Sequence, residues 1–133
     1  MRASARMTNA FFAIGRKSVL LLCLSVSYIA GKMMVVRALE AGAELLTVKV
    51  SSHPLRITGQ EEYVDRRIDL AAMVPMQVEE SMKSESEKQR FGYIRHLIIG
   101  GAPVSVALEE RLKKIPTQCY ACLLYTSDAA DEG

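Results

Sequence analysis

The sequence has no tryptophan and few other aromatic residues, with 3 phenylalanines and 5 tyrosines in 133 residues. A core formed by this chain must therefore be mainly aliphatic, with methionine filling irregular gaps. A strong charge of one sign is also lacking, since the formal net charge is +2 and the Lys and Arg residues are scattered along the chain. Nucleic-acid-binding proteins gather basic residues on one face. The composition therefore argues against nucleic acid as a partner.

Cysteine and histidine are scarce. The 3 cysteines are Cys23, Cys119 and Cys122, and the last two form a lone C-x-x-C without a second Cys or His pair nearby to complete a zinc site. Cys119 falls on an expected strand and is interpreted as a small buried apolar residue. His53 and His96 stand apart from any group of metal ligands and are interpreted as structural. The sequence therefore predicts no metal site, reduced thiols and a cytoplasmic location.

A long hydrophobic run is missing as well. The apolar run at residues 18–26 is too short to span a bilayer, which needs about 20 residues. Because Arg16 and Lys17 precede it, the run resembles a secretion signal. A buried parallel strand gives the same pattern, since both of its faces are apolar. The strand is the favoured interpretation, a secreted protein that uses residues 19–30 as its signal is the alternative, and no membrane partner is expected.

Short apolar runs alternate with stretches of helical periodicity, a pattern typical of βαβ units and a parallel sheet. Strands are expected at residues 18–24, 44–50, 71–74, 93–100 and 117–121. Helices are expected at residues 1–12, 29–41, from Pro75 onward and at 106–114. The fold class is therefore α/β, a partial parallel sheet with flanking helices. Because the first helix lacks a preceding strand and the last strand lacks a continuation, the chain is expected to be a piece of a larger domain.

One strand-to-helix junction has an unusual composition. Residues 98–103 read Ile-Ile-Gly-Gly-Ala-Pro, and Ser105 can cap the helix that follows. In open parallel sheets, ligands bind at the carboxyl ends of the strands. Two glycines at such an end allow a flat group to lie against the backbone, because no Cβ atom stands in the way. The alternative is a tight turn that needs glycine for its geometry alone.

The neighbours of this junction carry a resemblance to a known family. Residues 95–105 read Arg-His-Leu-Ile-Ile-Gly-Gly-Ala-Pro-Val-Ser, and with residues 107–110 they resemble the adenylate-forming acyl-CoA ligase superfamily, the AMP-binding enzymes. Residues 28–33, 72–77 and 115–121 resemble further family segments in the same order, so the likeness covers residues 1–121. The branch that this sequence resembles most is o-succinylbenzoate–CoA ligase of menaquinone biosynthesis.

The resemblance implies a fold, a reaction and a set of site residues. The fold is a piece of the large N-terminal domain, and the parent enzyme takes ATP, Mg²⁺, CoA and a small-molecule carboxylic acid. Its reaction forms an acyl-adenylate and then a CoA thioester. The implied adenine wall is Gly100, Gly101, Ala102 and Pro103. The implied residues near the acyl substrate are Tyr28, Gly31, Lys32 and Gln77, although Tyr28 is equally well interpreted as a core residue.

The family's catalytic parts are missing from the sequence. Its Gly/Ser/Thr-rich phosphate loop is expected upstream, and its Tyr-Gly-x-Thr-Glu motif, ribose-binding Asp and catalytic Lys are expected downstream. No residue of this chain is therefore assigned a catalytic role, and the chain alone is expected to be inactive. Residues 122–133 depart from the family and resemble the translation of a sequencing-library adapter, expected to be disordered, with a genuine acidic tail as the alternative. A small stand-alone α/β binding module without catalysis is the second hypothesis for the whole chain.

Overall fold

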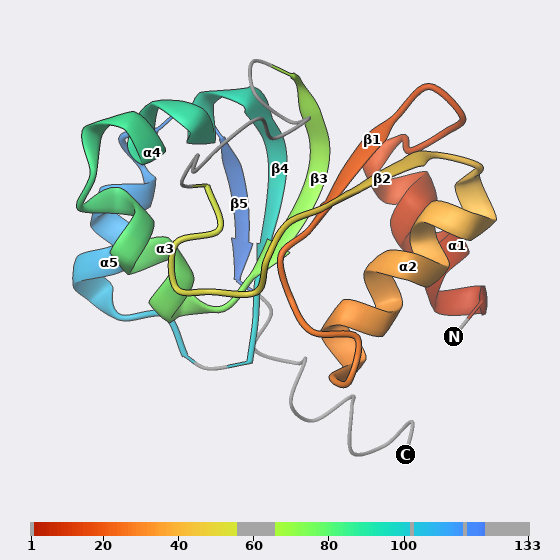
Figure 1. Ribbon diagram of the computed structural model, residues 1–133, viewed down its shortest axis with the longest axis horizontal. Helices are drawn as coiled ribbons and strands as arrows, with labels where there is room; N and C mark the ends of the chain where they lie inside the picture. The colour runs from red at the N-terminus through yellow and green to blue at the C-terminus, as the bar shows by residue number, and fades with distance from the viewer. Residues whose placement is uncertain (1, 56–65, 102, 116, 122–133) are drawn as a thin grey trace.

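A computed structural model describes residues 2–55, 66–101, 103–115 and 117–121 of the chain (Figure 1). The adapter-like tail at residues 122–133 lies outside the described residues, and so does the predicted boundary that separates it from the domain. Within the described residues the chain forms five strands, five α-helices and one short 3-10 helix. In chain order these are α1 (Arg2–Phe12), β1 (Val19–Leu22), α2 (Ile29–Ala41), β2 (Glu44–Thr47), β3 (Ile68–Met73), α3 (Pro75–Met82), α4 (Glu85–Arg90), η1 (Phe91–Tyr93), β4 (Ile94–Ile99), α5 (Val106–Leu112) and β5 (Gln118–Ala121).

The strands form one sheet in the order β2-β1-β3-β4-β5, and every neighbouring pair is parallel. This confirms the α/β class with a parallel sheet. Strand β1 lies between β2 and β3 and is buried along its whole length, with Leu21 paired to Leu46 on one side and to Ala71 on the other. The apolar run at residues 18–26 therefore contains an interior strand, as the favoured interpretation held. Among the described helices, none combines the length and the apolar character that a membrane span requires.

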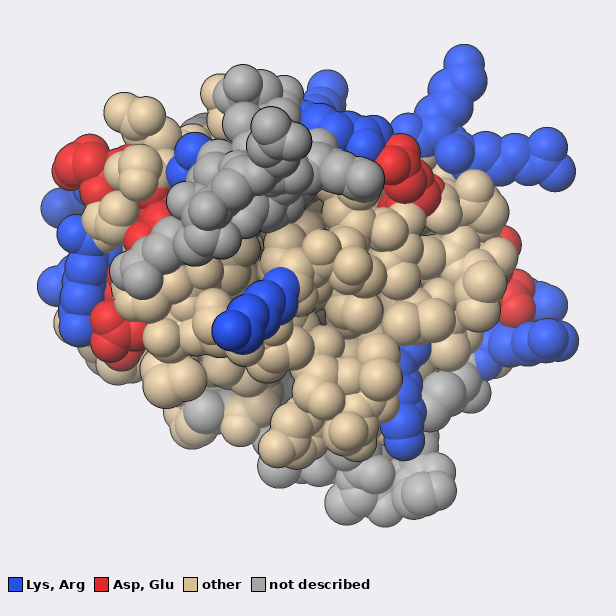
Figure 2. Space-filling view, viewed as in Figure 1, with Lys and Arg blue, Asp and Glu red and all other residues tan. Residues whose placement is uncertain are grey.

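Helices cover both faces of the sheet and create two cores (Figure 1). Helices α1 and α2 pack on one face, where Phe12, Met34 and Leu70 are buried together. Helices α3, α4 and α5 lie on the other face, where Phe91, Leu97 and other aliphatic residues are buried. Lys and Arg lie in several separate groups around the rim of the face shown in Figure 2, whose middle is mostly uncharged.

The helix boundaries follow from particular residues. Helix α2 ends at Gly42, whose φ of 66° places it in the left-handed region that glycine adopts readily. Helix α3 begins with Pro75, where the missing N–H costs no hydrogen bond. Helix α5 is capped by Ser105, whose side-chain oxygen accepts a hydrogen bond from the Leu108 N–H at 3.1 Å. The sequence predicted all three of these boundaries.

Three regions differ from the expectation. Strand β2 ends at Thr47, although the strand was expected to reach residue 50. Strand β3 begins at Ile68 rather than at residue 71, because the Asp69 carboxylate accepts a hydrogen bond from the Val19 N–H at 2.8 Å and so has a partner inside the sheet. The stretch after Pro75 forms two helices rather than one, and α4 is held by a buried contact. Glu87 is 2% exposed and lies 3.0 Å from Nδ1 of His53, which follows β2. His53 thus has a structural contact, in line with its interpretation.

Gln77 holds the start of α3 to two other segments. Its side-chain oxygen accepts a hydrogen bond from the Val74 N–H at 3.1 Å. Its side-chain nitrogen donates to the carbonyl oxygens of Cys23, at 3.1 Å, and Ser51, at 2.9 Å. One amide side chain, itself 2% exposed, therefore connects the ends of β1 and β3 to the loop after β2.

Replacing Gln77 by Met should lower the free energy of unfolding by about 2–3 kcal/mol, because each buried polar group left without a partner costs about 1–3 kcal/mol. Urea unfolding monitored by circular dichroism measures the loss. The matched control is Glu79→Gln on the exposed side of the same helix, which should change stability by less than about 0.5 kcal/mol. Equal losses in the two variants would contradict the role given to the Gln77 amide.

Candidate functional site

A cavity of about 340 Å³ opens at the carboxyl edge of the sheet. Its walls come from the segment after β1, the first turn of α2, the end of β3 and the junction after β4. The lining residues are Leu24, Tyr28, Ile29, Ala30, Ala72, Met73, Val74, Ile98, Gly100 and Gly101. This is the edge at which open parallel sheets bind ligands. We refer to it below as the carboxyl-edge cavity.

The glycine junction after β4 forms one wall of this cavity. The Gly100 N–H donates a hydrogen bond to the Met73 carbonyl at 3.1 Å, which holds the junction against the end of β3. Gly101 has a φ of +88°, and a Cβ atom there would lie 3.3 Å from Cγ1 of Val74. Both interpretations of the junction therefore apply, because Gly101 is needed for backbone geometry and also faces the cavity. Ala102 lies outside the described residues, and Pro103 is exposed and does not line the cavity.

Tyr28 forms the opposite rim. It is the residue before α2, and its side chain is 70% exposed, so the interpretation as a core tyrosine is wrong. The structure brings Tyr28 together with Gly100 and Gly101 around one cavity, although more than seventy positions separate them in the sequence. An exposed aromatic ring beside two glycines offers a surface on which a planar group can stack.

The other three predicted substrate residues do not line the cavity. Gly31 is buried in the first turn of α2, where a Cβ atom would lie 2.1 Å from the carbonyl oxygen of Ser25. Its role in the described structure is to let α2 approach that carbonyl. Lys32 is exposed on the adjacent position of α2. Gln77 directs its amide to backbone groups, as described above, and its hydrogen bond with the Val74 N–H holds a residue that lines the cavity.

The chemistry available in the cavity is that of binding. Its described lining carries no charged side chain, and Tyr28 contributes its one ionisable group. No group of three or more His, Cys, Asp or Glu suited to a metal ion occurs among the described residues. The cavity can therefore hold an apolar or planar group against a backbone surface, while the described lining offers neither a nucleophile nor a general base.

Sequence reasoning missed the apolar lining from β1 and β3. Leu24, Ala72 and Val74 each lie at or just after the end of an expected strand, which is the one signal that pointed to them. The end of a strand does not by itself identify a lining residue, because the strand order decides which strand ends lie beside one another. Ala30 and Ala72 leave space for the cavity by being small.

Gly31→Ala should lower the free energy of unfolding by about 2 kcal/mol, because the added methyl group meets a backbone oxygen and overpacking costs about 1–3 kcal/mol. Thermal unfolding measures the change. Gly15→Ala is the matched control, since a Cβ atom at Gly15 would find nothing within 4 Å. The control should stay within about 0.5 kcal/mol of the parent chain. A neutral Gly31→Ala variant would show that α2 does not sit this close to Ser25.

The described cysteines lie away from the cavity lining. Burial raises the pKa of Cys23 to about 12 and the pKa of Cys119 to about 11. A thiol with a raised pKa stays protonated at neutral pH, and the thiolate is the reactive form. Cys119 packs against the core beside α5, as a small apolar residue does. Cys122 lies outside the described residues.

Alkylation of Cys23 and Cys119 by iodoacetamide at pH 8 should therefore be at least about 100-fold slower than that of a free thiol. Peptide mass spectrometry resolves the two sites. In denaturant both cysteines should react at the rate of a free thiol, which serves as the internal control. Rapid labelling of Cys23 in the native chain would contradict its burial between the helices and the sheet.

Solved structures of AMP-binding enzymes share this fold. An acyl-CoA synthetase (AMP-forming)/AMP-acid ligase II-like protein from Dyadobacter fermentans is 32% identical with a TM-score of 0.79, and the match covers 90% of this chain and 33% of that protein. Wild-type E. coli MenE with a bound phenylether-linked analogue of OSB-AMS is 22% identical with a TM-score of 0.67, over 90% of this chain and 25% of that one. O-succinylbenzoate coenzyme A synthetase (MenE) from Bacillus subtilis, in complex with ATP and magnesium ion, is 16% identical with a TM-score of 0.66. That match covers 87% of this chain and 23% of the synthetase.

These comparisons confirm the resemblance to AMP-binding acyl-CoA synthetases and the match of the parallel sheet to their N-terminal domain. The likeness to the two MenE structures, at 22% and 16% identity, shows the fold alone. The chain spans about a third or less of the length of these proteins. No family model and no curated protein matches the sequence.

Proposed function

We propose that this chain is a section of the large N-terminal domain of an adenylate-forming acyl-CoA ligase. The observation that carries the proposal is the 32% identity and the TM-score of 0.79 to an AMP-forming acyl-CoA synthetase-like protein over 90% of the chain. The carboxyl-edge cavity supports it, because Tyr28 and the glycine junction meet there. In this proposal residues 1–121 belong to the domain, and residues 122–133 are not part of the enzyme.

The parent enzyme would catalyse two linked steps. A carboxylate oxygen attacks the α-phosphorus of Mg-ATP, which forms an acyl-adenylate and releases pyrophosphate. The thiol of CoA then attacks the acyl carbon, and AMP leaves as the thioester forms. Neutralisation of phosphate charge dominates the first step. The described lining of the cavity holds no cation. In this proposal the family's phosphate loop and catalytic Lys, which the sequence of this chain lacks, would supply that neutralisation, and the chain alone would be inactive.

The site residues take distinct parts in this proposal. Gly100 and Gly101, with Ala102 and Pro103 beyond them, form a wall for the flat adenine ring. Tyr28 faces the acyl group across the cavity. The remaining candidates act around the cavity. Gly31 sets the position of α2, and Gln77 holds the backbone at Cys23, Ser51 and Val74. Lys32 meets only the solvent-exposed part of a bound acid.

The acid proposed is o-succinylbenzoate, which places the parent enzyme in menaquinone biosynthesis in the cytoplasm. Residues 30–33 and the Val-Pro-Met-Gln turn at residues 74–77 support this branch, since they resemble the corresponding segments of o-succinylbenzoate–CoA ligase. The apolar lining of the cavity suits an aryl group. ATP, Mg²⁺ and CoA are the proposed cofactors, and a soluble carboxylic acid is the proposed substrate.

The genomic DNA on both sides of the coding segment provides the first test. It should encode a Gly/Ser/Thr-rich phosphate loop upstream and Thr-Tyr-Gly downstream once the tail at residues 122–133 is removed. The complete protein should then release pyrophosphate from ATP only when an acid is present, with o-succinylbenzoate compared against benzoate and a fatty acid. The 133-residue chain should release none. A stop codon directly after Gly133 in independent reads would favour the stand-alone binding module.

In the complete protein, Tyr28→Ala should raise KM for the acid about 10-fold, because one lost aromatic contact is worth about 0.5–1.5 kcal/mol. Tyr93→Ala is the matched control, since Tyr93 is also exposed but lies at the opposite edge of the sheet. KM for ATP should stay unchanged in both variants. Equal effects of the two substitutions on the KM for the acid would argue against a place for the acyl group beside Tyr28.

A further inference from the structure

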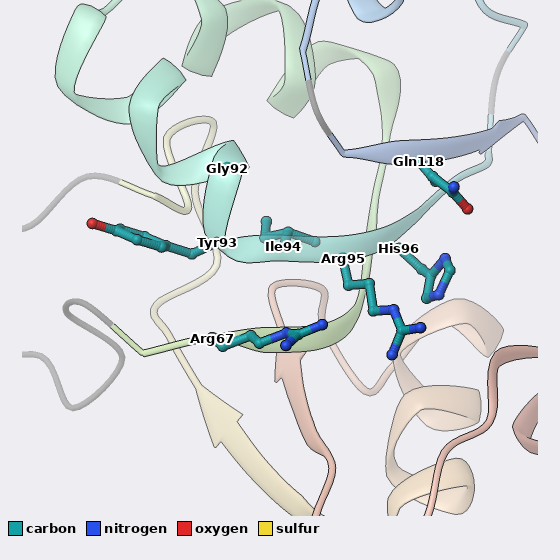
Figure 3. Close-up of a pocket in the computed structure, with 7 residues that line it drawn as sticks. All are labelled: Arg67, Gly92, Tyr93, Ile94, Arg95, His96 and Gln118. Carbon is teal, nitrogen blue, oxygen red and sulfur yellow. The ribbon is translucent and has the colours of Figure 1, made fainter.

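A second hollow, of about 400 Å³, lies at the amino ends of β3, β4 and β5. Its lining residues are Arg67, Gly92, Tyr93, Ile94, Arg95, His96 and Gln118 (Figure 3). It is at the opposite edge of the sheet from the glycine junction, since β4 runs from Ile94 to Ile99 between the two. We call it the amino-edge hollow. The proposed ligase reaction does not use it.

Two arginines in this hollow have no anionic partner among the described residues. Arg66 forms an ion pair with Glu44 at 2.7 Å, whereas the side chains of Arg67 and Arg95 make no hydrogen bond or ion pair with any described group. Both side chains line the hollow, Arg67 from the start of β3 and Arg95 from β4, while Tyr93 points away from them (Figure 3). No carboxylate among the described residues lies within ion-pair distance of either guanidinium group, so an anion bound between them would add an attraction that the described groups do not supply.

The side chain next to the arginines also has unused hydrogen-bonding capacity. Nδ1 of His96 is buried and has no hydrogen-bond partner in the described part of the chain. The centroid of its ring lies 4.9 Å from that of Phe12 and 5.9 Å from that of Tyr120. These contacts fix the orientation of the ring at the wall of the hollow. Burial, followed by the charge of Arg95, lowers the pKa of His96, and the Asp69 carboxylate opposes both effects. The imidazole is therefore neutral at pH 7 beside the Arg95 guanidinium.

Gln118 completes the polar lining from β5. Its side-chain oxygen accepts a hydrogen bond from the Tyr120 hydroxyl at 3.0 Å. This contact orients the amide so that its nitrogen remains as a donor. The charged groups around His96 are thus Arg67, Arg95 and Asp69, and the Asp69 carboxylate already accepts the Val19 N–H. The net charge that the hollow presents is positive.

We propose that the amino-edge hollow binds the phosphate group of a small phosphate monoester. Guanidinium groups present planar pairs of donors that match phosphate oxygens, and a phosphate monoester carries about 1.5–2 negative charges at pH 7, which suits two arginines better than a single carboxylate does. The volume of about 400 Å³ exceeds what a bare phosphate ion fills, and so leaves room for the organic part.

A second basic hollow on the molecule provides a contrast. It measures about 340 Å³ and is lined by Met82, Lys83, Lys88, Arg111 and Lys114. Lys83 already pairs with Glu80 at 3.3 Å, and lysine presents a point charge without the planar donor pair of arginine. This hollow shares the sign of charge with the amino-edge hollow but not its paired guanidinium groups. It therefore serves as the control.

The test is a titration of the 133-residue chain with glycerol phosphate, inorganic phosphate and acetate at constant ionic strength, followed by NMR of labelled histidine and arginine side chains. Glycerol phosphate should shift the His96 and Arg95 signals saturably. It should also raise the pKa of His96 relative to chloride buffer, because a nearby anion favours the imidazolium form. Inorganic phosphate should bind about 10-fold more weakly, and acetate more weakly still. Equal affinity for both phosphates would identify free phosphate as the ligand and overturn the monoester assignment.

Variants separate a site from general electrostatic attraction. Arg67→Gln combined with Arg95→Gln should abolish the saturable shift, whereas Arg111→Gln combined with Lys114→Gln removes the same charge from the control hollow and should leave it intact. Arg95→Lys keeps the charge and should weaken binding about 10-fold with an unchanged circular dichroism spectrum. Non-saturating shifts, or equal losses in the two double variants, would overturn the proposal.

Discussion

Parallel pairing of the strands is the constraint on which the rest of the structure depends. Parallel neighbours cannot be joined by a tight turn, so each connection must cross a face of the sheet. Helix α2 makes this crossing from β1 to β2, helices α3 and α4 make it from β3 to β4, and α5 makes it from β4 to β5. Every one of these crossings leaves from the carboxyl edge. The carboxyl-edge cavity exists because three such exits, after β1, β3 and β4, lie beside one another.

The two edges of the sheet differ in chemistry for the same reason. At the carboxyl edge the chain leaves through small and apolar residues, among them Ala72 and Gly101, which leave space and exposed backbone for a flat ligand. At the amino edge the chain enters through Arg67 and Arg95, which line one hollow because β3 and β4 are neighbours. Pairing of Ile68 with Ile94 fixes which residues come together there. One sheet therefore presents an apolar surface at one end and a cationic one at the other.

Residues beside a ligand site can act by holding the backbone rather than by touching the ligand. Resemblance to the ligase family implied that Gln77 and Gly31 lie near the acyl substrate. In the described structure neither residue lines the cavity. Gln77 satisfies backbone groups from three segments, and Gly31 allows a helix to meet the carbonyl of Ser25. A sequence motif does not distinguish a residue that holds the backbone from one that touches a ligand. The direction of the side chain in the folded structure distinguishes them.

The sequence by itself determined the α/β class, the position of most strands and helices, and the glycine junction at residues 100–103, because apolar periodicity and turn residues are local signals. It also carried the family resemblance. Tertiary structure decided the strand order, the entry of Asp69 into β3, and the meeting of Tyr28 with Gly100. It likewise placed Arg67 and Arg95 in the lining of one hollow. Such neighbours depend on the pairing of strands that are distant in sequence, and no local pattern encodes that pairing.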